Sequence, residues 1–83
     1  MKVKVKGLET VAIAGSFIRL DSLLKFTGVA ETGGEAKALI TDGIVSVNGG
    51  KCIQRGKKVY PGSFVRCRGS IWAIARAPAE HDD

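Results

Sequence analysis

The 83-residue chain has few of the residues from which catalytic and metal-binding sites are usually built. It contains two cysteines, Cys52 and Cys67, and its one histidine, His81, lies among acidic residues near the C-terminus. A zinc site, a Cys-His nucleophile or a Ser-His-Asp triad would each have to recruit that histidine, and no C-x-x-C pair is present. We therefore expect no metal, no cofactor and no covalent catalysis, with both thiols reduced and packed as small apolar side chains.

The chain also lacks a long apolar stretch. Its longest uninterrupted run covers residues 71–75, far short of the ~18 residues that a membrane helix needs. Residues 2–6 alternate Lys with Val and do not resemble a signal peptide, so we expect a cytoplasmic protein without a membrane partner. A chain of this length has room for one hydrophobic core. We expect one domain over residues 1–77, followed by a disordered acidic tail over 78–83.

Acidic residues are absent from a long part of the second half. The segment 51–76 has no Asp or Glu, and it carries seven basic residues: Lys51, Arg55, Lys57, Lys58, Arg66, Arg68 and Arg76. The whole chain has 13 Lys and Arg against eight Asp and Glu, which gives a net charge of +5. This surplus favours a polyanionic partner, with nucleic acid ahead of an acidic protein or a membrane surface.

Turn-forming residues divide the first half of the chain into short elements. Period-two alternation predicts one or two strands, over residues 2–6 and 10–14. Leucines at i, i+3 and i+4 predict a helix over 20–27 that ends at a glycine. The sequence T-G-G-E at 32–35 has the form of a capping box and begins a second helix, which stops at Gly43. Two short helices with a short connector predict a helix-turn-helix-like arrangement.

The second half of the chain has the pattern of antiparallel strands joined by turns. The predicted elements are a hairpin of 44–47 and 51–53 around Asn48-Gly49, a basic loop at 55–58, a type II turn at Pro61-Gly62, and a second hairpin of 64–68 and 71–76 around Gly69-Ser70. The sequence therefore predicts an α+β fold in which two short helices pack on a small, mostly antiparallel sheet.

Several motif elements occur in a fixed order between residues 17 and 65. They are Arg19-Leu20-Asp21, Leu23-Leu24, Gly28, Ala36-Lys37, Ile40, Gly43, Val45, Val47-Asn48-Gly49, Lys58-Val59 and Pro61-Gly62. Together they resemble the RNA-binding domain of the ribosomal protein S4 type, or αL motif, which also occurs in pseudouridine synthases, tyrosyl-tRNA synthetases and a ribosome-associated heat-shock protein. The sequences at 17–20 and 31–37 further resemble a subgroup of small free-standing bacterial proteins. The chain departs from the family at Ser63, where Asp is usual, and at Gly33-Gly34, where Ser-Arg is frequent.

The resemblance implies a protein that binds structured RNA, ribosomal or ribosome-associated, and that has no catalytic activity. We expect a monomer with no small-molecule substrate. A DNA-binding helix-turn-helix-like module is the alternative, because basic helix faces can also enter a major groove. An enzyme is disfavoured by the chain length and by the missing acid-base pair.

Helical spacing identifies candidate binding residues on both helices. Arg19, Ser22 and Lys25 share the solvent face of the first predicted helix, and Lys37 and Thr41 share that of the second. Cations at this spacing could straddle a phosphate backbone, although a charged face that only contacts solvent is the alternative.

The loops and turns supply the remaining candidates. Gly33-Gly34 would let a phosphate approach the start of the second helix, or would only shape the connector between the helices. Asn48 is primarily predicted to form a turn, and an RNA contact is its second possible role. The full set of predicted RNA-binding residues is Arg19, Ser22, Lys25, Gly33, Gly34, Lys37, Thr41, Asn48, Lys51, Arg55, Lys57 and Lys58.

Two further features of the second half bear on the partner. Arg66 and Arg68, expected on one face of their strand, could extend the basic patch. Trp72 and Tyr60 could stack on bases, but a single Trp in a chain this small favours the core.

Overall fold

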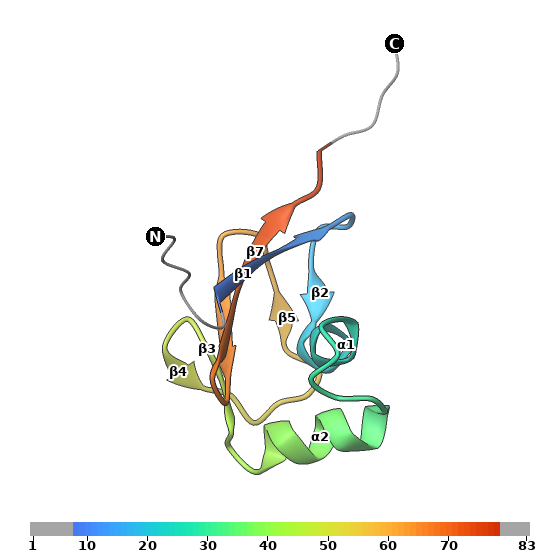
Figure 1. Cartoon of the computed structure of the whole chain (residues 1–83), viewed down its shortest axis with the longest axis vertical. Helices are drawn as coiled ribbons and strands as arrows, with labels where there is room; N and C mark the ends of the chain where they lie inside the picture. Colours follow the sequence, from blue (N-terminus) through green and yellow to red (C-terminus); the bar gives the residue numbers. More distant parts are fainter. Residues whose placement is uncertain (1–7, 79–83) are drawn as a thin grey trace, which may run out of the picture.

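The computed structural model describes residues 8–78, and Figure 1 shows how its elements are arranged. In chain order they are β1 (Leu8–Ile13), β2 (Ile18–Arg19), α1 (Leu20–Phe26), α2 (Gly33–Thr41), β3 (Val45–Val47), β4 (Gly50–Lys51), β5 (Lys58–Val59), β6 (Phe64–Cys67) and β7 (Ser70–Arg76). The strand expected over 2–6 and the tail expected beyond Pro78 lie outside the described residues.

The larger sheet has five strands in the order β1-β7-β6-β3-β4. β7 pairs antiparallel with β6 and parallel with β1, in a register that places Leu8 opposite Ile71. The other pairs in this sheet, β3 with β6 and β3 with β4, are antiparallel. The expected α+β fold with a mostly antiparallel sheet is therefore confirmed. The parallel pair was not predicted, because it joins the two ends of the domain and leaves no local turn signal.

A second sheet has two strands, β2 and β5, and was not predicted from the sequence. β2 and β5 pair antiparallel, with Ile18 opposite Val59 and Arg19 opposite Lys58. Lys58, expected in a basic loop, therefore begins a strand. Two-residue strands carry too short an alternation to be recognised in a sequence.

The basic loop also supplies the hydrogen-bond partners at the start of α1. The N-cap residue Arg19 makes no side-chain bond to the first helical N–H groups among the described residues. Instead, the N–H of Leu20 donates to the carbonyl of Lys57 at 2.8 Å, and the N–H of Asp21 donates to that of Arg55 at 3.0 Å. Backbone carbonyls thus do what a Ser or Asp side chain does at most helix starts.

The second helix is fixed at both ends by local hydrogen bonds. The Thr32 Oγ1 accepts from the Glu35 N–H at 3.0 Å, and the Glu35 carboxylate accepts from the Glu31 N–H at 2.7 Å. At the other end, the N–H groups of Gly43 and Ile44 donate back into the last turn, as in a Schellman motif, with Gly43 at a φ of 76°. The predicted N-cap at Thr32 and the glycine stop at Gly43 are confirmed. The predicted capping box is completed one residue earlier than expected, because the Glu35 carboxylate bonds the N–H of Glu31 and not that of Thr32.

Neither helix among the described residues has the length and apolar character needed to cross a membrane.

The two helices and the sheet share one hydrophobic core. Its members are Val11, Ile13, Leu20, Leu23, Leu24, Ala30, Ala36, Leu39, Ile40, Val45, Val59, Val65, Cys67, Trp72 and Ile74. Trp72 is 3% exposed, which confirms its interpretation as a core residue.

The two cysteines differ in burial. Cys67 is buried, whereas Cys52 is only half-buried, and neither is in a disulfide. The expectation that both thiols are core residues therefore holds for Cys67 alone.

The turn between β6 and β7 lies one residue earlier than expected. Cys67 pairs with Ser70, so the two-residue turn is Arg68-Gly69, with Arg68 at a φ of 59°. This register keeps Val65 opposite Trp72, and both are buried. Arg66 and Arg68 consequently do not share a strand face, which corrects the expectation from the sequence.

Asn48 connects the first hairpin to the start of β6. It has a φ of 52° in the turn before Gly49, as a type I′ hairpin requires. Its Oδ1 accepts from the Phe64 N–H at 2.9 Å, its own N–H donates to the Phe64 carbonyl at 2.8 Å, and its Nδ2 lies 3.4 Å from the Ser63 Oγ. The side chain therefore stabilises the fold directly.

We predict that Asn48→Ala lowers the free energy of unfolding by about 1–2 kcal/mol, because it combines a strained positive φ with a lost hydrogen bond. Asn48→Gly should lose less stability than Asn48→Ala, because glycine adopts the positive φ without strain, but it should still lack the stability contributed by the Asn48 side-chain hydrogen bond. Urea unfolding of both variants measures the two parts, and equal stability of Asn48→Ala and the wild type would contradict the prediction.

Candidate nucleic-acid interface

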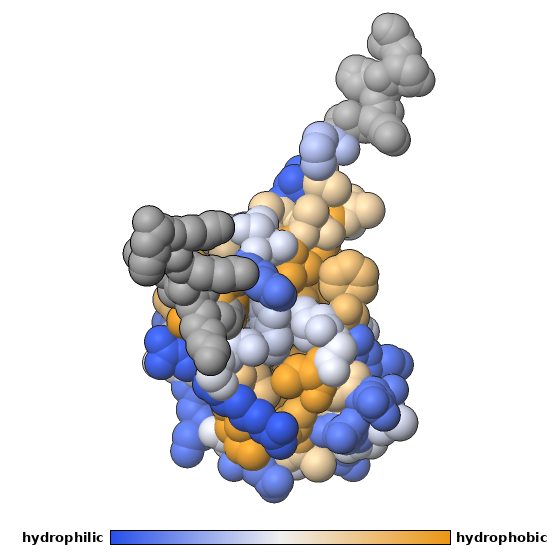
Figure 2. Space-filling model, in the orientation of Figure 1, coloured by the Kyte–Doolittle hydropathy of each residue, from blue (hydrophilic) through white to orange (hydrophobic). Residues whose placement is uncertain are grey.

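All seven predicted cations are exposed in the structure. They lie at the start of α1 and along it, on α2, at the end of β4, in the loop before β5 and at the start of β5: Arg19, Lys25, Lys37, Lys51, Arg55, Lys57 and Lys58. Figure 2 shows hydrophilic surface along both sides of the helical half of the molecule, with hydrophobic surface between them and again near the ends of β1 and β7.

Two of these cations meet at one carboxylate. The Arg19 guanidinium makes a two-point contact with Asp21, at 3.1 Å from Nε to Oδ1 and 3.0 Å from Nη2 to Oδ2. The Arg55 Nε lies 3.7 Å from the same Oδ2. Both arginine side chains are half exposed, whereas the Asp21 side chain is 16% exposed. Asp21 thus brings together arginines that are 36 positions apart in the sequence.

A backbone N–H of α1 also holds the Asp21 carboxylate in place. Its Oδ1 accepts from the N–H of Ser22 at 2.8 Å, in the first turn of α1, where the helix dipole favours a negative charge. A guanidinium has five N–H donors, so the two-point contact leaves further donors of Arg19 for another anion. In the sequence, Asp21 stands out only as part of the Arg19-Leu20-Asp21 motif. Its position between two predicted binding residues was the available signal.

Gly56 allows the basic loop to lie against the Arg19 guanidinium. A Cβ at Gly56 would be 3.5 Å from the Arg19 Nη2, so the loop backbone and the guanidinium are nearly in contact. Together with the two backbone bonds to the start of α1, this contact makes the loop and the helix one unit.

The glycines at the start of α2 leave the surface open. A Cβ at Gly33 would meet nothing within 4 Å, and a Cβ at Gly34 would meet only the Thr32 Oγ1 at 3.9 Å. Neither residue has a positive φ. The backbone geometry therefore does not require glycine at these positions, while Glu31 and Glu35 place negative charge beside them.

Other predicted binding residues have structural roles. The Thr41 hydroxyl donates to the Lys37 carbonyl at 2.9 Å, within α2. The Lys51 side chain packs against Gly43, where a Cβ would lie 3.1 Å from its Cδ, and this places its ammonium near the C-terminal end of α2. A cation is stabilised there by the helix dipole. These roles do not test RNA contact by Thr41 or Lys51, which stays a prediction.

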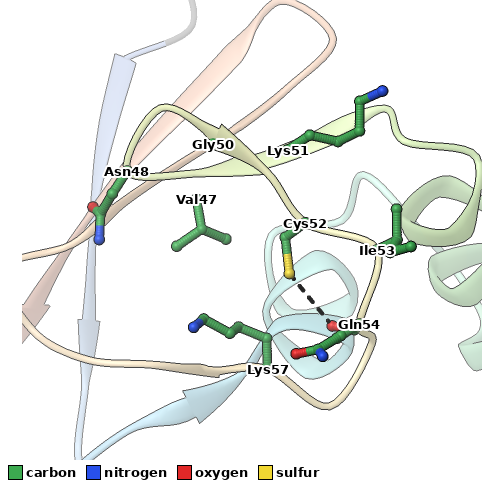
Figure 3. A pocket seen from close by; sticks show the side chains of 8 residues that line it. All are labelled: Val47, Asn48, Gly50, Lys51, Cys52, Ile53, Gln54 and Lys57. Carbon is green, nitrogen blue, oxygen red and sulfur yellow. Dashed lines mark hydrogen bonds between the residues drawn. The ribbon is translucent and has the colours of Figure 1, made fainter.

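A hollow of about 440 Å³ lies between the β3–β4 hairpin and the basic loop (Figure 3). It is lined by Val47, Asn48, Gly50, Lys51, Cys52, Ile53, Gln54 and Lys57. Figure 3 shows Lys57 extending into the hollow toward Val47, whereas the Lys51 ammonium points away from it. Three predicted binding residues thus border one concave surface that has no acidic residue among its lining side chains.

No group of three or more His, Cys, Asp or Glu side chains that could hold a metal ion occurs within residues 8–78.

Comparison with protein families gives a match to the S4 domain over residues 11–75, more than three-quarters of the chain. The chain belongs to the S4 domain family. The match includes the whole segment 17–65 that carried the resemblance and confirms it. No curated protein matches the chain. S4 domains are in general RNA-binding and not catalytic, and this places the exposed cations in the context of a polyanionic partner.

We predict that Asp21→Asn lowers the free energy of unfolding by about 1 kcal/mol or less, because its arginine partners are half exposed to solvent. The loss should shrink at high salt, where the attraction is screened. Urea unfolding at low and high ionic strength measures both effects, with Glu9→Gln, an exposed carboxylate at the start of β1, as the control. A loss that does not change with salt would contradict this electrostatic account.

The two thiols should differ in reactivity. Burial raises the pKa of the Cys67 thiol above its ordinary value, and the nearby Arg68 opposes this only in part. Cys67 therefore stays protonated near neutral pH, and the thiolate is the reactive form. We predict that iodoacetamide modifies the half-buried Cys52 first, as followed by mass spectrometry. Modification of both thiols at the same rate in the folded protein would show that Cys67 is not protected.

Proposed function

We propose that this S4 domain binds structured RNA, ribosomal or ribosome-associated, through a basic surface on α1, α2 and the 55–58 loop. The observation that carries the proposal is the attachment of the loop to the start of α1, through the Leu20–Lys57 and Asp21–Arg55 backbone bonds and the shared Asp21 carboxylate. This attachment holds the acid-free segment beside the cations of the first helix. Cations held on one rigid unit can meet a phosphate backbone without further ordering.

The side chains on this surface suit phosphate contact. Arg19 and Arg55 offer planar guanidinium groups that bind a phosphate at two points, while Lys25, Lys37 and Lys57 act as point charges. Such contacts position the protein on the RNA and read its shape, and they do not by themselves select a base sequence.

The DNA alternative, in which α1 and α2 form a helix-turn-helix-like unit, is less well supported. In such a unit the second helix reads base edges with side chains near its N-terminus. α2 begins instead with Gly33 and Gly34, which have no side chains, followed by Glu35, whose carboxylate is bonded back to the Glu31 N–H. We therefore favour RNA.

We also propose that the protein works as a cytoplasmic monomer without catalysis, with residues 1–77 as its one domain. The shared core of both helices and the larger sheet supports the single domain. The general character of the family supports the absence of catalysis.

Salt titration tests the proposed surface. If four to six cations contact phosphates, log K should fall with log salt at a slope of about −3 to −5, and removing one cation should reduce the magnitude of the slope by nearly one. Lys37→Ala and Lys57→Ala should each do so while changing stability by less than ~0.5 kcal/mol. Affinity for bacterial ribosomal RNA, with duplex DNA as competitor, is the measurement.

Arg66→Ala is the matched control, because Arg66 lies on β6 between Val65 and Cys67, which face the core. Its exposed side chain is therefore on the opposite face of the sheet. Unchanged affinity after joint replacement of Arg19, Lys37 and Lys57 in a normally folded protein would refute the proposed surface, as would equal losses from Arg66→Ala.

A further inference from the structure

Two aromatic side chains are exposed side by side next to the proposed surface. Phe17 is 39% exposed and Tyr60 is 50% exposed, and their ring centroids are 5.9 Å apart with the planes tilted by 54°. Phe17 precedes β2 and Tyr60 follows β5, whose residues Ile18 and Val59 are paired. The short two-stranded sheet therefore fixes both rings at one of its ends.

The surroundings of the pair are cationic. The Lys58 Nζ lies over one face of the Phe17 ring, 4.9 Å from its centroid, which leaves the Tyr60 ring and the rest of Phe17 for a base. Lys58 is paired with Arg19 across the two strands. Arg19 in turn contacts Asp21 and belongs to the proposed RNA-binding surface. Exposed aromatic faces next to Lys and Arg side chains are what sites for single-stranded nucleic acid are made of, because bases stack on the rings while cations hold the phosphates.

The exposure of these rings is not required by the fold. Trp72, the largest aromatic side chain, is in the core, and Val59 and Ile18 supply the buried and half-buried side chains of the short sheet. Phe17 and Tyr60 contact each other, which fixes the arrangement of the pair while leaving ring surface in solvent.

We propose that Phe17 and Tyr60 form a stacking platform for an unpaired nucleobase of the bound RNA, with Lys58 beside it for the flanking phosphate. This inference rests on the proposed RNA binding and specifies which kind of RNA is preferred. A base in a bulge, loop or single-stranded end can be turned out to stack on a ring, whereas a base within a duplex cannot. The domain then distinguishes a helix with an adjoining unpaired base from a fully paired one.

The test uses a short RNA stem-loop that carries a single-stranded 3′ extension containing 2-aminopurine, and the same stem-loop without the extension. Wild type should bind the extended RNA more tightly and quench the 2-aminopurine fluorescence as the base stacks. Tyr60→Ala should weaken binding of the extended RNA by about fivefold or more and abolish the quenching, since stacking on one ring contributes about 1–3 kcal/mol. Tyr60→Phe, which keeps the ring, should behave like wild type.

Phe64→Ala is the matched control, because Phe64 is 45% exposed on β6 and makes no part of the aromatic pair. It should leave both affinities and the quenching unchanged, and thermal melts establish that each variant is folded. Phe17→Ala gives a second, independent removal of a ring.

The outcomes separate the platform from the proposed function. If wild type binds both RNAs equally and Tyr60→Ala and Phe17→Ala change neither affinity, the platform is wrong and RNA binding by the basic surface stands. Equal weakening of both RNAs by Tyr60→Ala also overturns the platform, because the ring would then contact the paired region. If wild type binds neither stem-loop, the platform is wrong, and the proposed function fails as well if ribosomal RNA is not bound either.

Discussion

The start of α1 depends on hydrogen bonds from a loop that lies more than 30 residues later in the chain. Arg19 cannot cap the helix as a Ser or Asp would, and the carbonyls of Arg55 and Lys57 accept from the first helical N–H groups instead. Because the loop carbonyls point toward the helix, this contact fixes where the loop lies. The side chains of Arg55 and Lys57 remain exposed to solvent.

This arrangement brings positive charge to the positive end of a helix, which is unfavourable on its own. Asp21 offsets the repulsion, since its carboxylate lies in the first turn of α1 and contacts both Arg19 and Arg55. One acidic side chain thus allows two guanidinium groups to stay close together at the surface. The charge that remains is a net positive one, held in a defined geometry and available for an anion.

The parts of the fold that the sequence predicted correctly are those whose cause lies within a few residues. The N-cap at Thr32, the glycine stop at Gly43, the Asn48-Gly49 hairpin and the Pro61-Gly62 turn, where Ser63 donates to the Tyr60 carbonyl, all have local hydrogen bonds as their reason. The β1–β7 and β2–β5 pairs were missed because their partners are distant in the chain. For the same reason the sequence pointed to the cations as candidates without showing that Asp21 joins two of them.

The sequence motif of the family mixes residues that fold the domain with residues that face a partner, and only the structure separates them. Asn48 and Gly43 adopt positive φ values in a turn and a helix stop, so their identity follows from the backbone. Arg19 has an ordinary extended backbone and a half-exposed side chain, so its backbone conformation does not require an arginine at this position. The aromatic pair extends this reasoning beyond the motif. Tyr60 directly follows the buried Val59, so the strand determines where Tyr60 lies. Its side chain is nevertheless 50% exposed, and the ring is therefore available to a partner.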